Sequence, residues 1–172
     1  MAGPEALQAW AGRAADPSTA IVGLGNPDRG DDGIGVAVAR QIRARFCHRI
    51  FFEGEQRAES VVLDFLESET IRTVLFIDAA DFGGKPGEIR WFDADAAGRF
   101  LPAVSTHKVP LNLLMELLRG RGKQSFLLAV QPESTEFLAP ISRAARRAMD
   151  GLEKALNGYC YPDHKKCIGK SI

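Results

Sequence analysis

Residues 73–79, with the sequence TVLFIDA, form the stretch that decides the fold. Residues 74–77 are apolar without interruption, and the acidic Asp78 follows them directly. A strand that is apolar at every position, rather than at every second one, is typical of a parallel sheet covered by helices on both faces. The stretch therefore predicts a central strand with a layer of helices on each side.

Two similar apolar runs predict neighbouring strands, TAIVGLG at residues 19–25 and SFLLAVQ at residues 125–131. After the first of them, apolar residues recur every four positions from Ile34 to Phe46, which predicts a helix over residues 33–46. The same patterns predict further strands at 48–53 and 87–93, and further helices at 60–69, 109–120 and 139–156. Strands that alternate with helices in this way predict one α/β domain with a mostly parallel sheet and helices on both faces.

Composition limits the classes of function. The chain has 172 residues, of which 45% are hydrophobic, and its 22 basic and 22 acidic residues give a formal net charge of zero. The sequence has no stripe of basic residues of the kind that binds nucleic acid. It also has no apolar run that approaches the roughly 20 residues needed to span a bilayer. The first residues lack the pattern of a secretion signal, and Cys47, Cys160 and Cys167 are too few for a disulfide framework. These features predict a cytoplasmic protein without a nucleic-acid or membrane partner.

Three segments are expected along the chain. Residues 1–18 are rich in alanine mixed with polar residues, and a flexible leader is predicted there. Residues 19–157 carry all the predicted strands and helices of the folded domain. Residues 158–172 show no periodicity and are predicted to form a C-terminal tail.

The loop after the first predicted strand has the sequence NPDRGDDG, residues 26–33. A glycine-rich loop at this place usually binds phosphate through backbone N–H groups, but Asp28, Asp31 and Asp32 would repel an anion. The loop is therefore expected to meet something cationic.

Further candidate ligands should lie at the same edge of the sheet, because ligands bind beyond the carboxyl ends of parallel strands. Asp78 or Asp81 follows the central strand, His107 lies in the later segment STHKVPLN, and the first loop contributes Asp31 or Asp32. Two carboxylates and one imidazole suit a divalent first-row metal and leave coordination positions open.

Each of these residues also has a structural interpretation. Asp32 precedes a helix and could cap it, and Asp78 at a strand end could hydrogen-bond a turn. A lone histidine such as His107 is more often structural than a ligand, and this interpretation is kept for His48 and His164. The combination favours a site because all three loops are expected at one edge of the sheet.

The C-terminal tail carries three other potential ligands, Cys160, His164 and Cys167, in the order C-x3-H-x2-C. This spacing matches no common zinc module, and a fourth ligand is not evident. A solvated tail is the default interpretation, with zinc or nickel binding as the alternative.

Two other classes of protein fit the first loop less well. A dinucleotide-binding enzyme needs G-x-G-x-x-G, but Gly23 and Gly25 are followed by Asp28 where the third glycine belongs. The opening IVGLGNP resembles the first strand of peptidyl-tRNA hydrolases, but the chain continues into DRGDDGIG without the catalytic histidine of that family. Of the three classes considered, an enzyme that recognises a metal fits the sequence best.

Four segments together resemble the nickel-iron hydrogenase maturation endopeptidases. They are GLGNPDRGDDGIG at 23–35, FIDAADFGGKPGEIRWFD at 76–93, STHKVPLN at 105–112 and AVQP at 129–132. The resemblance covers residues 20–157. Within the family, the chain is most similar to the branch that acts on the hydrogenases of formate hydrogenlyase-type complexes.

The resemblance implies a three-layer α/β/α sandwich around a twisted sheet. It also implies an endopeptidase, aspartic-type by family grouping, that removes a C-terminal extension from the hydrogenase large-subunit precursor once nickel is inserted. A nickel-binding chaperone of hydrogenase assembly without proteolytic activity is the alternative function.

The resemblance further assigns the residues that contact the metal to Asp32, Asp78 and His107. Asp32 is preferred over Asp31 because the family uses the second acid of the pair. The nickel belongs to the substrate, where the precursor's own cysteines hold it, so that the protease supplies only oxygen and nitrogen donors. A metal-polarised carbonyl, a metal-activated water or a carboxylate acting as general base could each break the peptide bond.

Overall fold

The computed structural model describes residues 3–46, 49–100 and 109–157, and its centre is a five-stranded sheet in the order β2-β1-β3-β5-β4. Strands β2, β1, β3 and β5 are parallel, and β4 pairs antiparallel with β5 at one edge. The strands are β1 (Thr19–Gly23), β2 (Ile50–Phe52), β3 (Thr73–Ala79), β4 (Ile89–Asp93) and β5 (Gln124–Val130). The mostly parallel sheet predicted from the sequence is confirmed, and the strand predicted at 87–93 forms β4 at the edge of the sheet.

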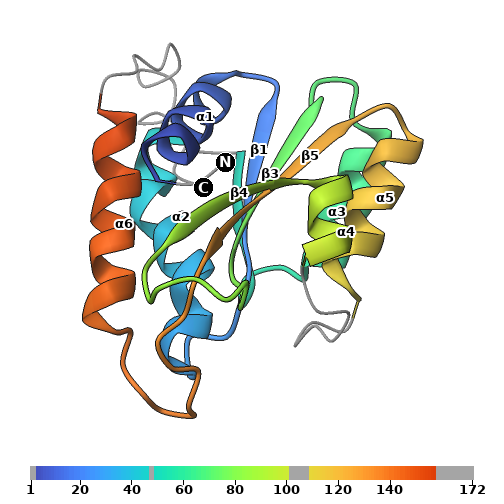
Figure 1. Cartoon of the computed structure of the whole chain (residues 1–172). Coiled ribbons are helices and arrows are strands. Elements are labelled where there is room, and N and C mark those ends of the chain that lie inside the picture. Colours follow the sequence, from blue (N-terminus) through green and yellow to red (C-terminus); the bar gives the residue numbers. More distant parts are fainter. Residues whose placement is uncertain (1–2, 47–48, 101–108, 158–172) are drawn as a thin grey trace.

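Helices cover both faces of the sheet (Figure 1). On one face lie α1 (Pro4–Ala15), α2 (Ile34–Phe46) and α6 (Arg143–Leu156), and on the other lie α3 (Ala58–Glu67), α4 (Ala94–Phe100) and α5 (Leu111–Gly120). The central strand divides its side chains between these layers, because Leu75 and Ile77 belong to the first apolar core and Val74 and Phe76 to the second. All four are fully buried, as the uninterrupted apolar run predicts.

The N-terminal segment differs from the prediction of a flexible leader at residues 1–18. Residues Pro4–Ala15 form α1, which packs on α6 and against β4. The side chain of Trp10 has no exposed surface, and its indole Nε1 donates a hydrogen bond to the Leu152 carbonyl at 3.3 Å. Alanines make up much of the buried side of α1, so the apolar character of this helix is weak in the sequence. The same small side chains allow α1 and α6 to pack closely.

The loop of residues 26–33, which we call the first site loop, is held close to the sheet by a glycine. At Gly35, in the first turn of α2, a Cβ atom would lie 2.0 Å from the Ile77 carbonyl oxygen and 2.5 Å from that of Leu24. No side chain fits this space, so glycine allows α2 to begin directly over the ends of β1 and β3. The approach places the loop before α2 at the carboxyl edge of the sheet, where ligand sites of parallel sheets form.

Among the described residues, no helix combines the length and the apolar character that crossing a membrane requires. The predicted tail, residues 158–172, lies outside the described part of the chain, and so do Cys160, His164 and Cys167.

Candidate active site

Three adjacent strands end at the candidate site. In the register of the sheet, Gly23 of β1 lies beside Phe52 of β2 and Ile77 of β3. The residues that follow, Glu53 and Asp78, are therefore brought to the same level on either side of β1. This placement depends on the order of the strands, because Glu53 and Asp78 are far apart in the sequence.

Asp32 lies in the short 3-10 helix Gly30–Gly33 just before α2 and is 6% exposed. Its Oδ2 accepts a hydrogen bond from the Asn26 backbone N–H at 2.9 Å, so this bond goes back across the loop and not forward into α2. In this contact the Asp32 side chain therefore does not act as a cap of α2. The carboxylate instead lines a pocket together with the loop that it closes.

Asp31 has a different role from Asp32, although the two are adjacent. It is 1% exposed, and its two carboxylate oxygens accept hydrogen bonds from the backbone N–H groups of Glu133 at 2.8 Å and Ser142 at 2.7 Å. Ser142 in turn caps α6, because its Oγ accepts from the Ala145 N–H. Asp31 thus ties the first site loop to the connection between β5 and α6, which supports the preference for Asp32 as the site residue.

Replacement of Asp31 by asparagine should destabilise the fold. The amide can accept only one of the two hydrogen bonds, and its NH₂ group would face a buried N–H donor. We expect a loss of about 3 kcal/mol in the free energy of unfolding, which lowers the melting temperature by about 6–12 °C. Thermal unfolding followed by circular dichroism measures this, and an unchanged melting temperature would show that Asp31 is not the anchor described here.

Asp78, at the end of β3, is 8% exposed and lies against the first loop. A Cβ atom built on Gly25 would be 3.5 Å from Asp78 Oδ1 and only 1.7 Å from the Asp32 carbonyl oxygen. Gly25 has a φ of 108°, in the region that favours glycine. The glycine therefore lets the strand end, the first loop and the Asp78 carboxylate meet at one place.

Asp81, the other candidate after β3, belongs to an exposed turn. Its Oδ1 accepts hydrogen bonds from the Gly83 N–H and from the Gln131 side-chain amide, both at 3.0 Å. The backbone hydrogen bond from Gly83, followed by the one from Gln131, lowers the pKa of Asp81 below its ordinary value. Gln131 also accepts from the N–H groups of Phe82 and Gly84, so that this group of contacts shapes the turn. These bonds give Asp81 a structural function.

Glu53, which follows β2, is a site residue that the sequence patterns did not indicate. Its Oε2 accepts a hydrogen bond from the Gly25 N–H at 2.8 Å, and its own N–H donates to the Gly23 carbonyl at 3.0 Å. Its position directly after an apolar strand is the signal that could have found it. Gly25 thus has Glu53 on one side and Asp78 on the other.

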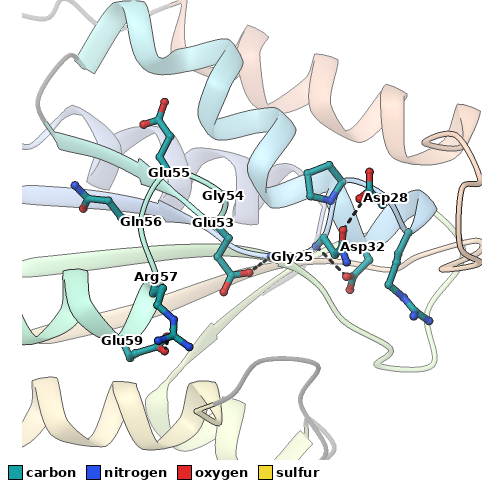
Figure 2. Close-up of a pocket in the computed structure, with 12 residues that line it drawn as sticks. Gly25, Asp28, Asp32, Glu53, Gly54, Glu55, Gln56, Arg57 and Glu59 are labelled. Atoms are coloured by element: carbon teal, nitrogen blue, oxygen red, sulfur yellow. Dashed lines mark hydrogen bonds and ion pairs between the residues drawn. The ribbon is translucent and has the colours of Figure 1, made fainter.

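A pocket of about 810 Å³ opens in front of Asp32 and Glu53 (Figure 2). Five carboxylates and two guanidinium groups line it, so negative charge is in excess. The lining residues are Gly25, Asn26, Pro27, Asp28, Arg29, Asp32, Glu53, Gly54, Glu55, Gln56, Arg57 and Glu59. Arg57 forms an ion pair with Glu59 at 3.3 Å, and Arg43 forms one with Glu55 at 2.6 Å. Asp28, Asp32 and Glu53 then stand against Arg29 alone, which leaves the excess charge on the side of Asp32 and Glu53. The pocket suits a cationic group.

Two of the three predicted metal-contacting residues, Asp32 and Asp78, are brought to this edge by the structure. Within residues 3–46, 49–100 and 109–157, no three histidine, cysteine, aspartate or glutamate side chains are placed to hold a metal ion. His107, the predicted nitrogen donor, lies outside these ranges, as does His48.

Comparison with known proteins gives a consistent result. The family described as hydrogenase maturation protease matches residues 51–158. The hydrogenase 3 maturation protease of Escherichia coli K12 is 29% identical over 137 residues, which cover 79% of this chain and 86% of the relative. A crystal structure of a hydrogenase 3 maturation protease has a TM-score of 0.67 at 28% identity, covering 83% of this chain and 90% of that one. The [NiFe] hydrogenase maturation protease HycI of Thermococcus kodakarensis has a TM-score of 0.64 at 30% identity, covering 80% and 86%.

The fold is α/β with carboxylates at the strand ends, and the family match and these relatives indicate the peptidase class. The chain belongs to the hydrogenase maturation protease family. The family resemblance drawn from the sequence is confirmed, and so is the three-layer fold that it implied.

Proposed function

We propose that the protein is an endopeptidase that removes the C-terminal extension of a nickel-iron hydrogenase large-subunit precursor after nickel insertion. The observation that carries the proposal is that the Asp32 backbone and the Asp78 carboxylate both lie next to Gly25, beside a pocket with excess negative charge that Asp32 helps to line. Membership of the maturation protease family supports the peptidase activity. The protein would act on its precursor in the cytoplasm.

In this proposal the nickel is part of the substrate and is contacted by Asp32, Asp78 and His107. Carboxylate oxygens and an imidazole nitrogen complement the thiolates that hold the ion in the precursor. A precursor without nickel offers nothing for these donors to bind, so metal contact would act as a check that assembly is complete.

Glu53 has a positioning function in this proposal. Its hydrogen bond to the Gly25 N–H holds the backbone on which the first loop turns, next to the Asp78 carboxylate. A shift of this backbone would move Asp32, because the Asp32 carboxylate is bound to the neighbouring Asn26 N–H. Bond cleavage itself could use a metal-polarised carbonyl, a metal-activated water or a carboxylate as general base.

Cleavage should depend on nickel in the substrate. We expect the purified protein to shorten nickel-loaded precursor, with a shift on a denaturing gel and release of the C-terminal peptide in a mass spectrum. Nickel-free precursor should stay at full length. Equal processing of both forms would exclude nickel recognition, and transfer of nickel without peptide release would favour the chaperone function instead.

A further inference from the structure

The connection between β5 and α6 exposes two large apolar side chains, Phe137 and Leu138. They are 67% and 74% exposed, the highest values among the large hydrophobic residues that the structure describes. They occupy the central positions of a turn that the Ala139 N–H closes by donating to the Glu136 carbonyl at 3.2 Å. We call these two residues the apolar tip.

The backbone of the apolar tip is strained. Leu138 has a φ of 60°, and it is the one residue other than glycine with a positive φ in the described part of the chain. Glycine or asparagine normally occupies such a turn position, because a branched side chain is disfavoured in the left-handed region. An exposed leucine gains little from burial there, so folding does not explain why it is present.

The tip is fixed to the first site loop by backbone hydrogen bonds. The Leu138 N–H donates to the Asp28 carbonyl at 2.6 Å, and the Gly30 N–H donates to the Ala139 carbonyl at 3.1 Å. The Asp31 N–H donates to the Ser134 carbonyl at 2.9 Å, in addition to the two bonds that its carboxylate accepts from the same connection. The tip and the loop that carries Asp32 are therefore hydrogen-bonded to each other, at the edge of the sheet where β1 and β5 end (Figure 1).

We infer that the apolar tip is a docking contact for an apolar surface of the hydrogenase large-subunit precursor, next to the segment that is cleaved. This inference rests on the proposed function. The pocket is polar and has room for only a short segment, whereas the substrate is an entire protein that needs a wider contact surface. Asp28 links the two, because it lines the pocket and its carbonyl is bound to Leu138. A precursor seated over Asp32 therefore extends over the tip, where an exposed aromatic and aliphatic pair can anchor it.

The double variant Phe137→Ser/Leu138→Gly tests this docking contact. Glycine adopts a positive φ freely, so the second change relieves backbone strain and the variant should remain folded. The matched control is Leu117→Ser, which removes a 42% exposed leucine from α5 on the other face of the sheet. Kd, KM and kcat are measured with nickel-loaded precursor for the wild type, the control and the double variant.

We expect the double variant to raise Kd and KM by at least about tenfold, the size of effect that loss of an interface anchor has. Its kcat at saturating precursor should stay within about twofold of wild type, because Asp32 and Asp78 are untouched. The Leu117→Ser control should match wild type. If the double variant does not fold, Leu138→Gly alone decides, with an expected smaller rise in the same two constants.

Each other result has a separate meaning. Unchanged Kd and KM in a folded double variant overturn the docking contact. Binding of precursor by the wild type without cleavage refutes the proposed function, but the ratio of the Kd values still decides the role of the tip. Absence of any binding by the wild type overturns both. A wild-type dimer that the double variant converts to a monomer, with Kd for precursor unchanged, would assign the tip to a second copy of this chain and overturn the proposal.

Discussion

Asp32→Asn should lower the rate of precursor processing at least about 100-fold, more than the 10–100-fold that loss of an outer partner of a metal ligand usually costs. The amide has nearly the shape of the carboxylate but lacks its charge, so it is a much weaker donor to a divalent cation. It can still accept the hydrogen bond from the Asn26 N–H, which here is 2.9 Å long. We therefore expect the melting temperature to stay within about 3 °C of wild type, since at most a fraction of one hydrogen bond is lost.

The control for this experiment is Asp150→Asn, the same chemical change at an exposed position of α6. It should leave processing and thermal stability unchanged. Rates are measured on nickel-loaded precursor by gel densitometry, with thermal unfolding on the same samples. An Asp32→Asn protein that processes the precursor at the wild-type rate would remove Asp32 from the metal-contacting residues. A large loss of stability would instead make it a second structural anchor like Asp31.

Much of the fold could be predicted because the strands are buried on both faces. The uninterrupted apolar run that becomes β3 and the glycine that ends β1 are visible without any partner. The same patterns could not show α1, because alanines form much of its buried side and its role becomes clear only against α6. Weak local signals of this kind are decided by tertiary packing.

The candidate site could be predicted in part for a related reason. Asp78 lies at the end of a long apolar strand and Asp32 in the loop after a strand that ends in glycine, and the rule for parallel sheets brings such positions to one edge. Glu53 follows a strand of only three residues, and its contact with Gly25 depends on the pairing of β2 with β1. The difference between Asp31 and Asp32 also needs the structure, because the partners of Asp31 lie more than 100 residues further along the chain.

Asp78→Asn should give the second large effect on processing. Asp81→Asn is its matched control, because the two residues are close in sequence and differ in their surroundings. Asp78 is buried next to Gly25. Asp81 is exposed, and its carboxylate accepts hydrogen bonds from the Gly83 N–H and the Gln131 side-chain amide. We expect Asp78→Asn to reduce processing of nickel-loaded precursor at least about 100-fold, as for a lost metal contact. Asp81→Asn should keep most of the activity, since an amide oxygen can still accept from Gly83.

A binding measurement separates loss of metal contact from a disturbed strand end. Zinc or cadmium salts should raise the melting temperature of the wild type, because an ion that binds only the folded state stabilises it by mass action. Asp78→Asn should lose most of this protection while its melting temperature without metal stays near that of wild type, and Asp81→Asn should keep it. If instead Asp81→Asn abolishes both processing and protection while Asp78→Asn retains them, the metal-contacting carboxylate lies on the turn after β3. The contacts of Asp32 and Asp78 next to Gly25 would then serve only to hold the first site loop in place.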